Sequence, residues 1–569
     1  MTLFSELLAR RMHLVRPLST DVLRERDLPV EMEDGVVLLA DRWVPAAQAS
    51  RPQPTVLVRS PYGRGQFVGL MFGRLLAERG LQVVVQSVRG TFGSGGTFAP
   101  FDERADGRAT LRWLRAQPWH AGGVGTFGPS YLGLVQWAIA AEAPEDLVAM
   151  AIQVSASEFH SQSYPGGSIS LETIASWMAI LAVQESRVAP VRINRALRSL
   201  GQLFGEHPLV GLDEAATGAP VGWLREGFAQ PGRDGDYWMR RDFSAAVPRV
   251  RAPVSFVGGW YDILLPWMLD DVVALQTAVP HRPPPRVIIG PWTHTSPELA
   301  AVGHREAIAF LRAGLLGDER LLRRRGGTPP VQLRLTGEGT VRREFASWPP
   351  PDAEPRRWFL AADGALAARA PELDRAGVDR YRYDPADPTP SFGGPVLMSR
   401  EAVVDNRPLE ARADVLTFTT EPLPALIESI GRPTVEVWAR CAAPSFDIFA
   451  RVCDVDEAGV SRNVCDALIS VRADRDEPLE DGSLRLNIAL WPLGHRFAAG
   501  HRIRLQISSG AYPRYARNPG TGEDPASAAP AGMRAVEVEI LRDGAHPSSV
   551  TLPVMSPQPP GSAGDGDGD

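Results

Sequence analysis

The stretch GTFGPSYLG, residues 125–133, decides how the first half of the chain folds. An apolar strand over residues 124–127 runs into a Gly-Pro-Ser turn, and a helix rich in Leu, Val, Ala and Trp is expected to begin directly after the serine. This order is the setting of a nucleophile elbow, where a sharp strand-to-helix turn projects the Oγ of Ser130 above a sheet. The pattern departs from G-x-S-x-G at one position, because Leu132 takes the place of the second glycine and Gly133 follows one residue late.

The segments on either side of this turn alternate between short apolar strands and helices. Strands are expected at residues 55–58, 81–85, 254–257 and 286–289, and helices at residues 67–79, 101–116, 266–278 and 305–316. Strands that are apolar on both faces are typical of a parallel sheet covered by helices on both sides. Residues 28–44 additionally predict a hairpin around the Asp34-Gly35 turn.

This α/β pattern is interrupted once. We expect it over residues 1–157 and again over residues 246–327, with a helix-like and loop-rich insertion at residues 158–245. The insertion carries several aromatic residues, including Trp177 and Trp223.

The chain after about residue 328 follows a different period. Apolar residues alternate strictly with other residues in many short runs, among them Val331, Leu333 and Leu335, and Ile503, Leu505 and Ile507. A period of two with turn residues between the runs predicts an antiparallel β-sandwich over residues 328–556. Residues 557–569, which end in GDGDGD, are expected to form a disordered acidic tail.

A serine nucleophile needs a base and an acid that orients the base, in the chain order serine, acid, histidine for this elbow. Asp262 follows the strand at residues 254–257, and His294 follows the strand at residues 286–289. The carboxyl ends of parallel strands meet at one edge of a sheet, so both side chains are expected beside Ser130. Other candidate acids and bases fall on expected helices: Asp270, Asp271 and His304.

The sequence contains no lysine, so all 60 residues counted as Lys+Arg are arginine. Schiff-base chemistry, a P-loop and a Ser-Lys dyad are therefore excluded. The base for Ser130 has to be a histidine.

An oxyanion hole needs donors for the tetrahedral intermediate. The backbone N–H of Tyr131, directly after the serine, is one donor. The loop after the strand at residues 55–58 lacks an HGGG-type sequence, so the hydroxyl of Tyr62 is the natural second donor. A tyrosine that merely packs in this loop is the alternative.

Aromatic residues close to these motifs could form an acyl pocket: Phe92, Trp260, Tyr261 and Trp267. They could equally be plain core. A substrate with a free ammonium group would also need unpaired carboxylates, for which Glu158, Asp234 and Asp236 are candidates. An anionic acyl group would have to be bound by arginine, and Arg64 and Arg89 are the first two candidates.

Composition excludes several other classes of protein. A length of 569 residues with 44% hydrophobic content predicts a globular protein of two to four domains. The net charge is −7 and no basic cluster stands free of acidic residues, which argues against nucleic-acid binding. No stretch approaches the roughly 18 apolar residues that cross a membrane.

The N-terminal residues lack the apolar core of a signal peptide because Arg10, Arg11 and His13 interrupt it, so a cytoplasmic location is expected. The three cysteines, Cys441, Cys453 and Cys465, form no CxxC pair, and no HExxH or clustered His/Asp spacing occurs. We expect neither a metal nor a cofactor.

Five motifs in this order resemble the CocE/NonD serine hydrolases, the group that includes cocaine esterase, α-amino-acid ester hydrolases, glutaryl acylases and Xaa-Pro dipeptidyl-peptidases. They are RSPYGR around Tyr62, VRGTFGSGG at residues 88–96, GPSYLG around Ser130, GGWYD ending at Asp262 and GPWTH ending at His294. The resemblance covers nearly the whole chain. It implies an α/β-hydrolase core with a helical cap insertion and a C-terminal all-β jelly roll. It also implies a Ser130, Asp262, His294 triad and an oxyanion hole from the Tyr62 hydroxyl and the Tyr131 amide.

The expected reaction is acyl transfer to water through an acyl-enzyme on Ser130. A small-molecule carboxylic ester or activated amide is the favoured substrate, and an Xaa-Pro dipeptidyl-peptidase or acylase is the alternative. A second alternative is a non-catalytic protein on a vestigial hydrolase core, whose sandwich binds a carbohydrate or a partner. A homodimer through the β-domain is a further hypothesis.

Overall fold

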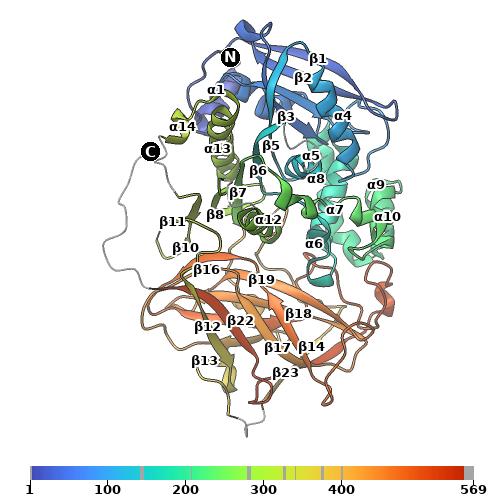
Figure 1. Ribbon diagram of the computed structural model, residues 1–569. Helices are drawn as coiled ribbons and strands as arrows, with labels where there is room; N and C mark the ends of the chain where they lie inside the picture. The colour runs from blue at the N-terminus through green and yellow to red at the C-terminus, as the bar shows by residue number, and fades with distance from the viewer. Residues whose placement is uncertain are drawn as a thin grey trace.

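The computed structural model describes residues 3–140, 146–206, 208–278, 283–323, 329–339, 341–372, 377–398 and 401–556. The acidic tail expected at residues 557–569 lies outside the described residues. Figure 1 shows an α/β core in the upper half, a group of helices beside it and a β-sandwich below. The α/β core with a helical insertion and the C-terminal sandwich expected from the sequence are confirmed.

The core is built on a ten-stranded sheet in the order β1-β2-β4-β3-β5-β6-β7-β8-β9-β11. Its central strands β4, β3, β5, β6, β7 and β8 pair in parallel, as expected. β4 and β7 are buried at every position because helices cover both faces of the sheet. The first eight strands are β1 Val22–Glu31, β2 Val37–Pro45, β3 Gln53–Ser60, β4 Gln82–Ser87, β5 His120–Pro129, β6 Leu147–Gln153, β7 Val254–Tyr261 and β8 Arg286–Thr293.

Helices of the core lie on both sides of this sheet: α1 Leu3–Arg11, α4 Arg104–Arg115, α5 Tyr131–Ala140, α12 Leu265–Ala278, α13 Pro297–Leu316 and α14 Arg320–Arg323. The single helix expected at residues 67–79 is instead broken by a π-helical turn, Gly69–Arg74, between α2 Gln66–Val68 and α3 Leu75–Ala77. This turn packs closely on Trp43, since a Cβ at Gly73 would lie 2.5 Å from the Trp43 ring.

The insertion between β6 and β7 is helical and forms a cap. It contains α6 His160–Ser163, α7 Leu171–Val183, α8 Ala189–Glu206, α9 Leu212–Thr217, α10 Gly222–Ala229 and α11 Asp236–Met239. The cap has its own apolar core, which also takes in Ala516 and Ala526 of the β-domain. The cap therefore packs against the β-sandwich as well as against the α/β core (Figure 1).

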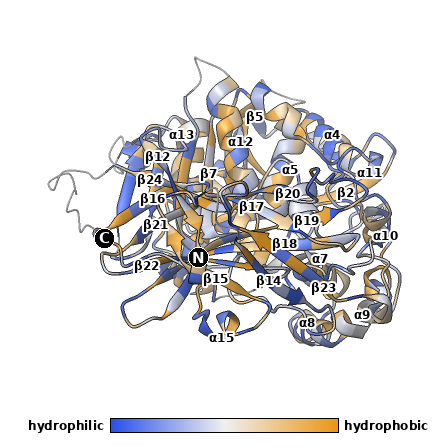
Figure 2. Ribbon diagram, turned by 90° about the horizontal axis from the view of Figure 1, so that it is seen from below, coloured by the Kyte–Doolittle hydropathy of each residue, from blue (hydrophilic) through white to orange (hydrophobic). Residues whose placement is uncertain are grey.

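The C-terminal domain packs a ten-stranded sheet and a four-stranded sheet, the latter in the order β15-β22-β18-β19. The view from below in Figure 2 shows hydrophobic and hydrophilic residues on the same strands of this domain. In the strand Val536–Leu541, the residues Val536, Val538 and Ile540 are buried, as expected. Its elements are β10 Thr336–Gly337, β12 Ala353–Leu360, β13 Leu366–Ala367, β14 Val378–Tyr383, α15 Arg407–Glu410, β15 Leu416–Thr419, β16 Ile427–Gly431, β17 Thr434–Arg440, β18 Ser445–Val455, β19 Ser461–Arg472, β20 Leu484–Ala489, β21 Leu493–Phe497, β22 Arg502–Ser508, β23 Val536–Leu541 and β24 Ser549–Met555.

The expected start of the sandwich at residue 328 is wrong. β9, Val331–Arg334, pairs in parallel with β8, and β11, Arg342–Phe345, pairs with β9, so both strands extend the core sheet. Alternation of apolar and other residues is expected in any strand with one covered face. An edge strand of the α/β core such as β9 meets this condition as well as a sandwich strand does. The chain first enters the sandwich at β10, directly after β9.

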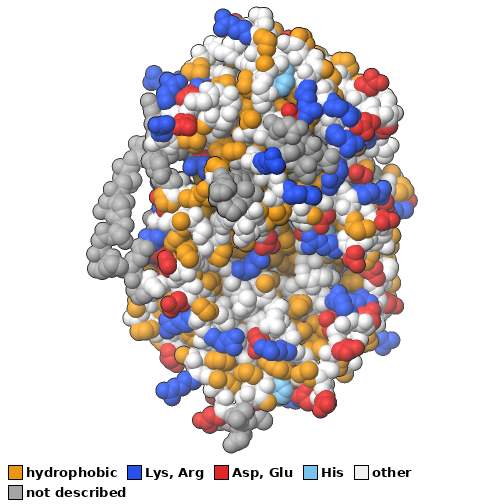
Figure 3. All heavy atoms as spheres, in the orientation of Figure 1, with side chains coloured by type: hydrophobic (Ala, Val, Ile, Leu, Met, Phe, Trp, Pro, Cys, Tyr) orange, Lys and Arg blue, Asp and Glu red, His pale blue; other side chains and the backbone are white. Residues whose placement is uncertain are grey.

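Charged side chains of both signs are interspersed over the face of the molecule drawn in Figure 3. Among the described residues, no helix is long and apolar enough to cross a membrane.

Gly133, the late glycine of the turn motif, lets α5 pack against the segment that follows β6. A Cβ at position 133 would lie 2.4 Å from the Cβ of Ser155 and 3.2 Å from Cγ2 of Ile152. The Ser155 hydroxyl is buried there and finds no hydrogen-bond partner among the described residues. Space at this contact, rather than backbone conformation, requires the glycine.

We therefore predict that Gly133→Ala lowers the free energy of unfolding by about 1–3 kcal/mol, because the new methyl group overpacks this contact. Adding Ser155→Gly removes the closest atoms that the methyl group meets, and it should restore most of the loss. Urea unfolding of the two single variants and the double variant measures the coupling. Independent losses that simply add in the double variant would contradict the packing explanation.

Candidate active site

Ser130 lies on the sharp turn between β5 and α5, in a left-handed backbone conformation with φ of +55°. Such a conformation is strained for a residue with a side chain and is kept where surrounding contacts hold it. The backbone N–H of Ser130 donates to the carbonyl of Gln153 in β6 at 2.9 Å, and its carbonyl accepts from the N–H of Leu134 at 3.1 Å. The turn is thus bound to the sheet on one side and to the helix on the other.

The departure at Leu132 has a structural explanation. A Cβ at Gly128 would lie 2.3 Å from the Cβ of Leu132. Gly128 therefore makes room for Leu132, and Gly133 makes room for Ser155. The two glycines allow a bulky residue at the position that is small in the G-x-S-x-G pattern.

His294 and Asp262 are joined by a hydrogen bond of 2.5 Å between Nδ1 of the histidine and Oδ2 of the carboxylate. Asp262 follows β7 directly and His294 follows β8 directly, so both lie at the sheet edge where Ser130 follows β5. Asp262 is fully buried and His294 nearly so. Oδ1 of Asp262 also accepts from the backbone N–H of Leu264 at 2.9 Å, which fixes the carboxylate plane.

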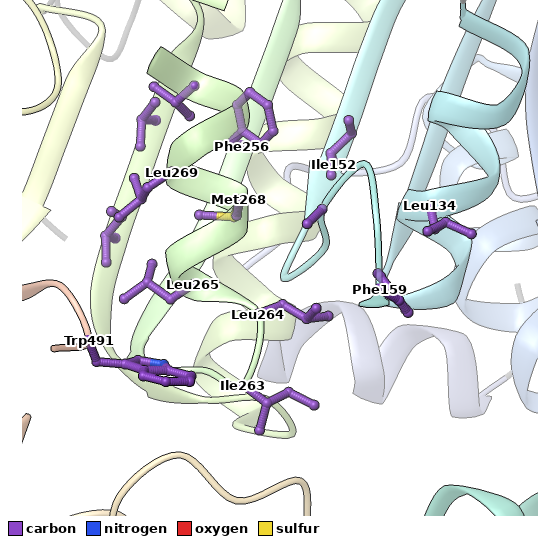
Figure 4. Close-up of a cluster of buried hydrophobic side chains, with 14 of the residues drawn as sticks. Leu134, Ile152, Phe159, Phe256, Ile263, Leu264, Leu265, Met268, Leu269 and Trp491 are labelled. Atoms are coloured by element: carbon purple, nitrogen blue, oxygen red, sulfur yellow. The ribbon is translucent and has the colours of Figure 1, made fainter. Parts of the chain in front are cut away.

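The β-sandwich supports this acid through Trp491, a residue that sequence reasoning missed. The Trp491 indole N–H donates to the backbone carbonyl of Asp262 at 3.0 Å, and its ring packs edge-on against Trp267. Figure 4 shows Trp491 beside the loop that carries Ile263 and Leu264. No local pattern around Trp491 indicates this contact, because it joins two domains far apart in the sequence.

The other candidate acids, Asp270 and Asp271, and the other candidate base, His304, have structural partners. His304 is buried in α13, its Nδ1 lies 2.8 Å from the Ala300 carbonyl, and burial lowers its pKa to about 4. Asp271 is buried, and it accepts from the N–H and hydroxyl of Ser157. Asp270 is half exposed and pairs with Arg432.

A cavity opens above Ser130 between the core and the cap. Its lining is mostly aromatic and aliphatic, and no charged side chain occurs among the described residues that line it. These are Tyr62, Phe101, Ser130, Tyr131, Phe159, Gln162, Ser163, Tyr164, Thr173, Ile174, Trp177, Trp223, Leu224, Gly227, Phe228, Tyr237, Trp238, Ile263, Leu264 and Leu397.

The four pocket residues expected from the sequence do not line this cavity. Phe92 borders a separate hollow on the far side of Tyr62, and Trp267 borders one beside Trp491. Trp260 donates to the Arg334 carbonyl at 2.7 Å, and Tyr261 is buried with its hydroxyl bonded to Thr336. These residues sit next to catalytic motifs in the sequence, but their side chains point into the domain interfaces, and the cap supplies the walls instead.

The carboxylates considered for an ammonium group also lie outside the cavity lining. Glu158 is buried and accepts from the N–H of Ser161 at 3.0 Å, Asp234 is exposed, and Asp236 begins α11.

The two arginines considered for an anionic acyl group pair with carboxylates elsewhere. Arg64 pairs with Asp27 and Asp41, and Arg89 pairs with Asp34 and Asp106. Neither arginine lines the cavity above Ser130.

Tyr131 is anchored by a buried polar network that the sequence did not reveal. Its hydroxyl donates to Oε1 of Glu103 at 2.5 Å, and Arg59 pairs with the other carboxylate oxygen at 2.8 Å. Burial raises the pKa of both Tyr131 and Glu103. The side chain after Ser130 is thus held in place, which also fixes the position of its backbone N–H at the start of α5.

Tyr62 lines the cavity together with Ser130, on the loop after β3. Its hydroxyl oxygen accepts from the indole N–H of Trp177 at 3.0 Å. Burial raises the pKa of Tyr62 to about 12, so the phenol stays protonated at neutral and mildly alkaline pH. A protonated hydroxyl beside the nucleophile is suited to stabilise an oxyanion.

The family models that match this chain and its relatives among known proteins agree on one family. Residues 34–296 match the model of the X-Pro dipeptidyl-peptidase (S15 family), and residues 325–551 match the model of the X-Pro dipeptidyl-peptidase C-terminal non-catalytic domain. Cocaine esterase of Rhodococcus sp. (strain MB1 Bresler) is 29% identical over 573 residues, which cover 92% of this chain and 97% of that protein.

Two solved structures share the whole fold. An α-amino acid ester hydrolase aligns with a TM-score of 0.79 at 21% identity, covering 95% of this chain and 98% of that one. An aminopeptidase from a marine sediment Thaumarchaeota archaeon aligns with a TM-score of 0.78 at 22% identity, covering 94% and 97%.

We predict that Ser130→Ala abolishes ester hydrolysis, because it removes the hydroxyl that is expected to form the acyl-enzyme. Ser163→Ala is a matched control: Ser163 lines the same cavity, but its hydroxyl donates to the Phe159 carbonyl at 2.8 Å. Initial rates and thermal unfolding are measured for both variants. Retained turnover in a folded Ser130→Ala protein would exclude Ser130 as the nucleophile.

Replacing Tyr62 by phenylalanine removes the hydroxyl that we expect to be an oxyanion donor and keeps the ring. We expect kcat to fall by about 10²- to 10³-fold, with a much smaller change in KM, because the interaction forms in the transition state. Steady-state kinetics on a p-nitrophenyl ester measures both constants. An unchanged kcat would place the second donor elsewhere.

Proposed function

We propose that this chain, which belongs to the CocE/NonD family of serine hydrolases, hydrolyses carboxylic esters of uncharged, apolar acids. The reaction uses the three residues at the carboxyl ends of β5, β7 and β8. His294 takes the proton of Ser130 as Oγ attacks the carbonyl carbon, and Asp262 holds the imidazole in the required tautomer. The Tyr62 hydroxyl and the Tyr131 amide stabilise the oxyanion.

Collapse of the first tetrahedral intermediate breaks the ester bond, and His294 returns the proton to the departing alcohol. Water then attacks the acyl-enzyme, with His294 again as base, and releases the acid and free Ser130. All groups that these two steps need are present on this chain, and the reaction consumes only the ester and water.

The proposed preference for an apolar acyl group rests on the uncharged lining of the cavity. Its lining offers large aromatic surfaces for the acid and, among the described residues, no carboxylate for an ammonium group. Burying an ammonium ion without a partner is costly, so a substrate with a free α-amino group should bind poorly in the productive orientation.

A dipeptidyl-peptidase is the second candidate, favoured by the description of the matched S15 family model. It would have to recognise the peptide N-terminus through a carboxylate outside the lining described above. Glu158 is the nearest in sequence, since it directly precedes Phe159 of the cavity wall. A homodimer and a cytoplasmic location stay predictions from the sequence.

A matched pair of substrates separates the two candidates: the p-nitrophenyl esters of 3-phenylpropanoic acid and of phenylalanine, which differ only by the α-ammonium group. We expect kcat/KM to be at least about tenfold higher for the uncharged ester, because the cavity offers the ammonium no partner. Alanyl-prolyl p-nitroanilide serves as the peptidase substrate. Faster cleavage of the amino-acid ester or of the anilide would overturn the proposal in favour of the peptidase.

A further inference from the structure

The cap reaches the hydroxyl of Tyr62 through a hydrogen bond. The indole Nε1–H of Trp177, on cap helix α7, donates to the hydroxyl oxygen of Tyr62 at 3.0 Å. Trp177, Tyr62 and Ser130 all line the same cavity. Trp177 is therefore more than a wall of the pocket, because it contacts the atom that is proposed to stabilise the oxyanion.

The Trp177 ring is held by aromatic neighbours, so the direction of its N–H is fixed. It stacks on Phe101 with ring centroids 5.3 Å apart and planes inclined by 13°, and it stacks more loosely on Tyr131 at 6.0 Å. Trp223, from α10, packs against it at 5.3 Å. Rings from both the core and the cap thus enclose the indole.

The same helix is bound to the core loops at its C-terminal end. The Gln184 side-chain amide donates to the carbonyl of Pro61 at 3.0 Å, one residue before Tyr62. The N–H of Phe92 donates to the carboxylate of Glu185 at 3.0 Å. These contacts keep α7 at a constant distance from the loop that carries Tyr62.

The hydrogen bond also decides where the Tyr62 proton points. A phenol has one O–H to donate, and its oxygen accepts from Trp177, which has a donor only. Among the described residues the Tyr62 hydroxyl donates no hydrogen bond, and Tyr62 lines the cavity. The proton is thus left for a substrate oxygen, and donation from Trp177 strengthens Tyr62 as a donor in turn.

We propose that Trp177 is a positioning residue that orients and polarises the Tyr62 hydroxyl, so that the cap completes the oxyanion hole. This inference rests on the proposed role of Tyr62 as oxyanion donor. It predicts that Trp177 affects the rate of acyl transfer through Tyr62, whereas a residue that only lines the pocket affects binding whether Tyr62 has its hydroxyl or not.

A double-mutant cycle tests this with Trp177→Phe, Tyr62→Phe and the double variant, assayed on p-nitrophenyl 3-phenylpropanoate. Trp177→Phe keeps an aromatic wall and removes the N–H. We expect it to lower kcat by about five- to tenfold in the presence of Tyr62, which corresponds to one hydrogen bond. In the Tyr62→Phe background the same change should alter kcat by less than about twofold.

Trp223→Phe is the matched control, since Trp223 lines the same cavity and packs against Trp177. Its effect should be the same in both backgrounds. Circular dichroism and thermal unfolding ensure that only folded variants enter the cycle.

The outcomes test the role of Trp177 and the role of Tyr62 separately. An equal loss of kcat from Trp177→Phe in both backgrounds would overturn the role of Trp177 while leaving Tyr62 as oxyanion donor. A Tyr62→Phe variant with unchanged kcat would remove the oxyanion role itself, and the role of Trp177 with it.

Discussion

The hydrogen bond between His294 and Asp262 joins the ends of two neighbouring parallel strands, and the arrangement of the site depends on it. A buried carboxylate is stable only when donors surround it, and Asp262 has the imidazole and the N–H of Leu264. The loop that carries it is held from outside the core, because Trp491 of the sandwich donates to the Asp262 carbonyl. The β-sandwich is therefore part of the support of Asp262, the proposed acid of the triad.

The core, the cap and the sandwich each supply different residues to the site. The core supplies the proposed reacting groups on its sheet edge, with Ser130 held on a strained turn. The cap supplies most of the aromatic cavity wall and the indole of Trp177, while the sandwich adds Leu397 to the wall. The apolar core of the cap takes in Ala516 and Ala526 of the sandwich, so the two domains also pack against each other. A change in the cap is thus expected to reach the chemistry through Tyr62.

Much of this could be predicted from the sequence, for a physical reason. Parallel strands bring their carboxyl ends together, so motifs far apart in the chain, such as those at Ser130 and His294, fall on one edge of the sheet. The residues that line the cavity could not be predicted. Trp260 and its neighbours in the sequence point away from the cavity, and the cap residues follow no periodic pattern that would identify them. The boundary at residue 328 failed because alternation marks any half-covered strand. Trp491 was missed because its partner lies in another domain.

Ser130 is proposed to be a nucleophile activated at this sheet edge. Labelling with a fluorophosphonate, followed by peptide mapping by mass spectrometry, is a direct test because the reagent requires the same activated serine, which attacks phosphorus in place of a carbonyl carbon. We expect one label per chain, on the peptide that contains Ser130, with ester hydrolysis lost in proportion to labelling. Full hydrolytic activity with Ser130 unlabelled, or loss of activity with the label on another residue, would contradict it.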